Sequence, residues 1–132
     1  SEEPEITLRE NWEKSWKSAR EAYDNFLFHA ALEDIFNFIK GINRYAEVRA
    51  PWKLAKSEDP ADRKTLETTL ALMAEGLRLA ACALRPVMPE VSAKILDLVG
   101  ADQIDIWDER MEWGSSLEGA KMGEKTILFP RP

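Results

Sequence analysis

The residues best suited to contact a ligand lie in residues 43–56, where a tryptophan follows a proline among basic side chains. Pro51 is expected to end the amphipathic helix that leads into this stretch, because proline lacks a backbone N–H and disfavours helical geometry at the preceding residue. Trp52 follows at once. The basic side chains around it are Arg44, Arg49, Lys53 and Lys56. A large aromatic ring among cations can stack on an unpaired nucleic-acid base, which makes this stretch a candidate nucleic-acid contact.

A structural role for Trp52 is the alternative that the residues leave open. Tryptophan is usually largely buried, so Trp52 could instead plug the end of a helical bundle as part of its core. Asn43 falls near the middle of the apolar stripe of the preceding helix, where a polar side chain must be hydrogen-bonded or it costs ~1–3 kcal/mol. Asn43 is therefore predicted to tie down a neighbouring loop or to position the Pro51–Trp52 corner, as a supporting residue and not as a ligand contact.

Catalytic chemistry leaves little trace in the sequence. His29 is the only histidine and sits at the expected start of a helix, so no histidine-based metal cluster is available. Cys82 lies within a long apolar segment, which is a poor setting for a reactive thiolate. There is no glycine-rich loop of the kind that cradles phosphates. We expect no catalytic residue, metal or cofactor in this segment.

Length and charge narrow the class of protein. The 132 residues suffice for one domain with a real core, and 45% hydrophobic with 32% charged residues is typical of a soluble globular protein. The net charge of −6 argues against a broad basic surface, so any nucleic-acid contact must be local. No apolar run approaches the ~20 residues that span a bilayer, and the acidic N-terminus is unlike a signal peptide. A single cysteine fits a reducing compartment, so a cytoplasmic protein without membrane contact is expected.

Apolar side chains recur at spacings of three and four in four segments, which predicts four principal helices. Thr7 and Glu10 form a capping-box pattern that would start the first helix at Leu8. Asp24 or Asn25 is expected to end this helix and to cap the second one.

Proline and glycine set the remaining boundaries. Asp59 as N-cap and Pro60 at the first helical position predict the start of the third helix, and Pro86 ends it. Two apolar sides indicate that this helix is central. The fourth helix is expected to start at Pro89 and to end at Gly100. Its inward side chains are predicted to be Val91, Ile95 and Leu98.

The pattern changes after Gly100. Residues 102–109 are expected to make one or two helical turns, and the glycine-punctuated stretch from Trp113 onward reads as an extended tail. The fold prediction is all-α, an antiparallel helical bundle over residues 1–100 followed by an irregular C-terminal tail over residues 101–132.

Several segments match one known family in the same order. They are Ala-Leu-Glu at 31–33, Asn-Arg-Tyr at 43–45, Ala-Pro-Trp-Lys-Leu-Ala-Lys at 50–56, Leu-Arg-Pro-Val-Met-Pro at 84–89, Lys-Ile-Leu at 94–96 with Gly100, and a closing peptide from Trp113-Gly114 to Leu128-Phe129-Pro130-Arg131. Together they resemble the C-terminal part of bacterial-type methionyl-tRNA synthetases. The matches extend over nearly the whole chain, and it is their combination that is specific.

The resemblance implies a tRNA anticodon-binding domain of the class I synthetase type. In that family a tryptophan in the Pro-Trp step stacks on an anticodon base, and Trp52 is the matching position. Possible supporting residues are Asn43, Arg49, Lys53 and Lys56. The family also uses an asparagine and an arginine on an earlier helix, which would lie upstream of Ser1, so Asn43 and Arg44 are not their counterparts.

The resemblance also implies that the chain is a fragment of a longer enzyme. The catalytic domain, which uses ATP and methionine to charge tRNA, is missing. Expected partners are therefore the methionine-accepting tRNA and the catalytic domain of the same enzyme, and the tail over residues 101–132 would pack back on the bundle or on that domain.

Two other functions compete with anticodon recognition. One is a helical protein-interaction bundle without an RNA role, in which Trp52 belongs to the core and the acidic faces bind partners. The other, with less to support it, is a stand-alone tRNA-binding subunit. Exposure of Trp52 separates anticodon recognition from the protein-interaction bundle, because a stacking residue must reach solvent.

We predict that the 132-residue chain alone neither activates methionine nor charges tRNA, because it lacks the motifs of a nucleotide-binding site. The check is methionine-dependent pyrophosphate exchange with the purified chain, and exchange above background would contradict the prediction.

Overall fold

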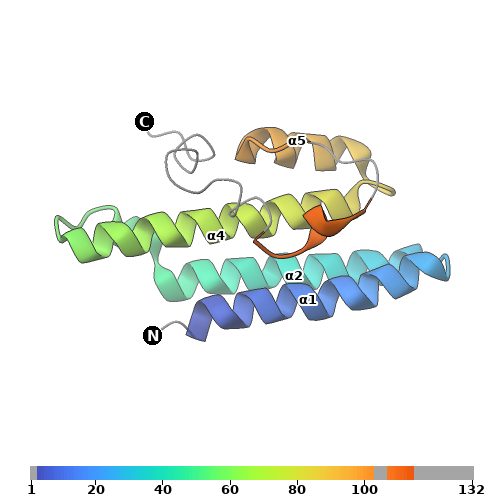
Figure 1. Ribbon diagram of the computed structural model, residues 1–132, viewed down its shortest axis with the longest axis horizontal. Helices are drawn as coiled ribbons and strands as arrows, with labels where there is room; N and C mark the ends of the chain where they lie inside the picture. The colour runs from blue at the N-terminus through green and yellow to red at the C-terminus, as the bar shows by residue number, and fades with distance from the viewer. Residues whose placement is uncertain (1–2, 103–106, 115–132) are drawn as a thin grey trace.

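The computed structural model describes residues 3–102 and 107–114, and the predicted all-α antiparallel bundle is confirmed (Figure 1). Four helices form the bundle: α1 (Glu3–Asp24), α2 (Phe28–Arg49), α4 (Pro60–Leu84) and α5 (Pro89–Val99). A short helix, α3 (Pro51–Leu54), connects α2 to α4, and one 3₁₀ turn, η1 (Glu109–Met111), follows α5. Consecutive long helices run in opposite directions, and no strand occurs among the described residues.

The helices pack in the order α1, α2, α4, α5, each mainly against its neighbours in the chain. The predicted central helix is α4, and the prediction is confirmed, because its residues 78–84 are all buried. The largest fully buried side chains include Trp12 from α1, Phe38 from α2 and Leu79 from α4. Gly76 lets α4 approach α2 closely, since a Cβ there would lie only 3.0 Å from the Cδ1 of Ile42.

The boundaries predicted from proline and glycine are confirmed. Pro51 follows the end of α2, and α4 begins at Pro60 with the Asp59 carboxylate accepting a hydrogen bond from the Ala61 N–H (3.0 Å). The next helix begins at Pro89 and ends before Gly100, whose φ of 71° is the left-handed conformation that glycine adopts without strain.

The predicted starts of the first two helices are wrong. α1 begins at Glu3, not Leu8, and Thr7 lies inside the helix. A proline is compatible with the first turn of a helix, and the acidic Glu3 and Glu5 favour the positive end of its dipole. α1 does end at Asp24, but the N-cap of α2 is Leu27, which makes no side-chain capping bond.

The predicted buried faces of α2 and α5 are partly wrong. Asn43 is exposed, because α2 lies between α1 and α4 and buries the face that carries Ile42 and Tyr45 instead. Residue 43 is turned by ~100° from residue 42, which takes it out of this interface. On α5 only Ile95 of the three predicted inward side chains is partly buried; Leu98 is 85% exposed. The buried positions of α5 are Ser92 and Leu96.

Hydrogen bonds attach residues 107–114 to α1 and α4. The Trp12 indole N–H donates to the Met111 carbonyl (3.0 Å), and the Trp107 indole N–H donates to the Cys82 carbonyl (3.1 Å). The Gly114 N–H donates to the buried Glu75 carboxylate (2.7 Å). Of the turns expected over residues 102–109, the described part contains only η1, while residues 103–106 and the tail from 115 to 132 lie outside the described residues. The division of the chain at residue 100 stays a prediction.

We predict that Tyr23→Phe lowers the free energy of unfolding by ~1–2 kcal/mol while leaving the helical content unchanged. The Tyr23 hydroxyl donates to the Ala83 carbonyl (2.7 Å), in the last turn of α4, where carbonyls have no partner within the helix. Urea unfolding followed by circular dichroism measures the loss. An unchanged midpoint would show that solvent satisfies this carbonyl equally well.

Candidate nucleic-acid interface

A left-handed residue turns the chain sharply at the end of α2. Ala50 has φ 48° and ψ 63°, and its N–H donates to the Ala46 carbonyl (2.7 Å), which closes α2. Its own carbonyl accepts from the Lys53 N–H (2.9 Å), which starts α3 directly at Pro51. A residue other than glycine pays ~1–2 kcal/mol for this conformation, so the surrounding structure must hold the corner in place.

The corner presents Trp52 to solvent. Trp52 is 54% exposed, so the structure does not place it in the core. Lys53 and Lys56 are also exposed, in and just after α3. An exposed aromatic ring together with nearby cations is the combination that proteins use to bind single-stranded nucleic acid.

Glu5 holds the last turn of α2. Its carboxylate accepts two hydrogen bonds from the Arg49 guanidinium, from Nε at 2.7 Å and from Nη2 at 2.6 Å. The buried Tyr45 donates its hydroxyl to the same carboxylate at 2.6 Å. Burial tends to raise the pKa of Glu5, but the Arg49 and Tyr45 hydrogen bonds outweigh it and hold that pKa below its ordinary value. We call these three residues the Glu5 clamp.

The structure gives two predicted supporting residues other parts than expected. The Arg49 guanidinium is engaged with Glu5 and acts on the corner by fixing the end of α2. Asn43 is exposed about two turns before the corner. Glu5 is the residue that sequence reasoning missed, because it lies 44 residues from Arg49 and before Leu8, where the first helix was predicted to start.

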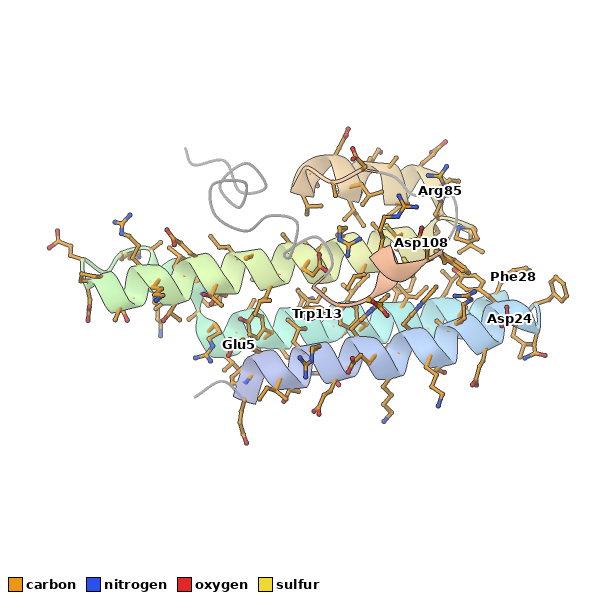
Figure 2. All side chains as sticks on the ribbon, viewed as in Figure 1. Glu5, Asp24, Phe28, Arg85, Asp108 and Trp113 are labelled. Carbon is orange, nitrogen blue, oxygen red and sulfur yellow. The ribbon has the colours of Figure 1, made fainter. Side chains whose placement is uncertain are left out.

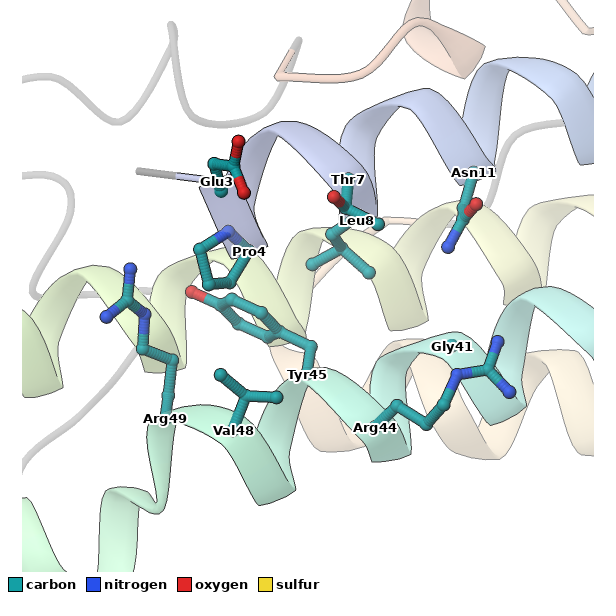
Figure 3. Close-up of a pocket in the computed structure, with 10 residues that line it drawn as sticks. All are labelled: Glu3, Pro4, Thr7, Leu8, Asn11, Gly41, Arg44, Tyr45, Val48 and Arg49. Carbon is teal, nitrogen blue, oxygen red and sulfur yellow. The ribbon is translucent and has the colours of Figure 1, made fainter. Parts of the chain in front are cut away.

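Two grooves flank the Glu5 clamp. One, of about 400 Å³, runs between the start of α1 and the second half of α2, with Asn11 and Arg44 at one end and Arg49 at the other (Figure 3). The second, of about 590 Å³, is lined by residues of α1, the start of α4, and Trp113. Arg49 lines both grooves, and it is only three residues before Trp52.

The described residues contain no group of three or more His, Cys, Asp or Glu side chains placed to hold a metal ion. Cys82 is buried, and burial raises the pKa of its thiol, which disfavours the reactive thiolate. Within the same residues no helix is long and apolar enough to cross a membrane.

Comparisons with known proteins point to one family, although no protein-family model matches the chain. Methionine–tRNA ligase of Lactococcus lactis is 35% identical over 131 residues, which cover 99% of this chain and 20% of that enzyme. The ligase of Fusobacterium nucleatum is 39% identical over 110 residues, 80% of this chain and 17% of the relative. The free-state crystal structure of Mycobacterium tuberculosis methionyl-tRNA synthetase superimposes with a TM-score of 0.71 at 37% identity, over 75% of this chain and 20% of that one.

The bundle is thus of the type found in class I aminoacyl-tRNA synthetases. Within that class, the chain is homologous to the C-terminal part of the methionine–tRNA ligases. It spans about a fifth of the length of the relatives that it matches.

We predict that Glu5→Gln lowers the free energy of unfolding by ~1 kcal/mol at pH 7, because it removes a partly buried, charge-assisted pair of hydrogen bonds. The pKa of Glu5 is lowered by folding, so its stabilisation is complete above the ordinary value of 4.5 and is lost as the pH falls through the folded-state value. Urea unfolding should therefore show a smaller difference from the wild type at pH 3 than at pH 7. The exposed Glu13→Gln is the control, and an equal difference at both pH values would contradict the assignment.

Proposed function

We propose that this chain recognises the tRNA anticodon as the C-terminal domain of a methionine–tRNA ligase, with Trp52 stacking on an anticodon base. The observation that carries the proposal is the exposed indole of Trp52, held at a strained corner by the end of α2 and the start of α3. Homology to the C-terminal part of methionine–tRNA ligases supports it. Methionine activation with ATP belongs to the part of the enzyme that this chain does not match.

Local contact reconciles this function with an acidic chain. The net charge of −6 disfavours phosphate binding over most of the surface, so recognition must rest on stacking and on local groups of cations. Lys53 and Lys56 are the exposed cations next to Trp52 in the chain. We infer that they contact the phosphates next to the stacked base and that the rest of the enzyme makes the other contacts with the tRNA. We also infer that the enzyme works in the cytoplasm.

One feature favours the protein-interaction bundle as the second candidate. The turn between α1 and α2 exposes three consecutive apolar side chains, Phe26 at 78%, Leu27 at 57% and Phe28 at 45%. It lies at the end of α2 opposite to Trp52, so it is separated from the corner by the whole helix (Figure 2). Both candidates can hold at once if the turn contacts protein and the corner contacts RNA.

We predict that Trp52→Ala in the full-length enzyme lowers kcat/KM for tRNA ten- to hundredfold. A base–aromatic contact contributes ~1–3 kcal/mol, at ~1.4 kcal/mol per tenfold change in rate. Methionine activation without tRNA should be nearly unchanged, because it does not involve the anticodon. The melting temperature should also be preserved, since the indole is half exposed.

The matched control is Phe36→Ala, which truncates another exposed aromatic side chain of the bundle. It should leave kcat/KM for tRNA unchanged. A Trp52→Ala enzyme that loses stability and methionine activation together, with no selective tRNA defect, would refute the stacking role. Equal defects in both variants would show that the effect does not belong to the corner.

A further inference from the structure

The groove of about 590 Å³ beside the Glu5 clamp differs from the rest of the surface in its chemistry. Arg9 from α1 and Lys64 from α4 are exposed and line it from two helices, and within the described residues neither makes an ion pair. The groove's carboxylate, Glu5, is already neutralised by Arg49. The groove therefore carries an excess of about two positive charges on a chain whose net charge is −6.

Trp113 gives this groove an aromatic wall. It is partly buried, packs against the core and lines the groove (Figure 2). Its position is fixed by the next residue, because the Gly114 N–H donates to Glu75, a buried carboxylate that Arg78 pairs at 2.8 Å. Thr65 and Thr68 add hydroxyl groups along the same wall of α4. Cations, hydroxyls and an aromatic ring are the side chains that hold single-stranded nucleic acid.

The groove lies at the Trp52 end of the bundle. Arg49 lines it, and three residues of chain place the Cα atoms of Arg49 and Trp52 at most ~11 Å apart. The short helix α3 packs on α4, which supplies Lys64 to the groove. A single-stranded RNA whose base stacks on Trp52 can therefore continue along the protein surface into this groove.

We infer that this groove is a second nucleotide subsite, which binds the single-stranded RNA next to the base stacked on Trp52. Arg9 and Lys64 contact phosphates, and Trp113 contacts a ribose or base. The inference rests on the proposed function. It adds that this groove, which is distinct from the Trp52 corner, binds RNA independently of the nucleotide sequence. Its alternative occupant is another part of the full-length enzyme, and the experiment distinguishes the two.

The test is the salt dependence of binding between the 132-residue chain and an anticodon stem-loop RNA. Each phosphate contact to a single strand contributes ~0.7 to the slope of log affinity against log salt concentration. The double variant Arg9→Gln/Lys64→Gln should reduce that slope by ~1.4, which corresponds to roughly 25-fold weaker binding at 0.1 M salt and little difference near 1 M. The loss should be equal for a loop with a changed anticodon, because phosphate contacts carry no sequence information.

The control is Lys14→Gln/Lys17→Gln, which removes two exposed charges from α1 farther from the Trp52 end. It should change the slope far less. An equal effect of both double variants would overturn the subsite and leave only a general charge effect.

Two further outcomes separate this inference from the proposed function. If Arg9→Gln/Lys64→Gln leaves the slope unchanged while Trp52→Ala weakens binding to the stem-loop, the subsite is refuted and anticodon recognition stands. If Trp52→Ala also has no effect, both are refuted. A lower melting temperature of the full-length Arg9→Gln/Lys64→Gln enzyme with an unchanged slope would assign the groove to a protein contact, which also overturns the inference.

Discussion

The position of the exposed indole depends on one carboxylate. Glu5 ties the first turn of α1 to the last turn of α2 through Arg49 and Tyr45, directly before the left-handed Ala50. This ion pair stabilises both helices, because the negative Glu5 lies at the positive N-terminal end of α1 and the positive Arg49 lies at the negative C-terminal end of α2. With the end of α2 fixed, Ala50 has little freedom to relax into an ordinary conformation. The strain at the corner is thus offset by interactions that Trp52 does not itself make.

A second carboxylate, Glu75, holds the segment that carries Trp113. Glu75 is 1% exposed, and a charge buried to that degree requires partners. Arg78 supplies two hydrogen bonds one turn later in α4, and the Gly114 N–H supplies another from residues that follow the last helix. Arg78 supplies the positive charge that compensates the Glu75 carboxylate, and the Gly114 N–H adds a hydrogen bond to it. The segment that carries Trp113 is therefore held where it lines the groove, although η1 is its only regular turn.

The features that sequence reasoning predicted correctly act on the backbone locally. Pro51, Pro60 and Pro89 each begin a helix, and Gly100 ends one, because their effect does not depend on distant contacts. Exposure of Trp52 was left open between two interpretations. In the structure α3 begins directly after the left-handed Ala50, and this turn exposes Trp52. Sequence reasoning could not predict the turn, because alanine has no preference for the left-handed conformation.

The errors concern contacts between elements. Asn43 and Ile42 are adjacent in the chain, and only the placement of α2 between α1 and α4 decides which of them is buried. Leu98 reads as an inward residue by type, yet α5 packs through Ser92 and Leu96. Glu5 could not be paired with Arg49 from the sequence, because 44 residues and a complete helical hairpin separate them. Periodicity identifies a helix, but partner helices select its buried face.

A binding ring is most useful when its support is rigid, and this bundle supplies that support from both sides of α3. On one side the Glu5 clamp fixes α2. On the other, the Ser57 hydroxyl donates to Asp62 (2.7 Å) and accepts from the Asp59 N–H (3.1 Å), which secures the link into α4. Because the Trp52 indole is half exposed, it contributes less hydrophobic stabilisation to the fold than a buried indole would. A ligand that covered the ring would gain that stabilisation on binding. Because the ring's backbone is already held, a base that stacked on it would lose little affinity to ordering the protein, and the proposed anticodon contact of an acidic chain depends on that preorganisation.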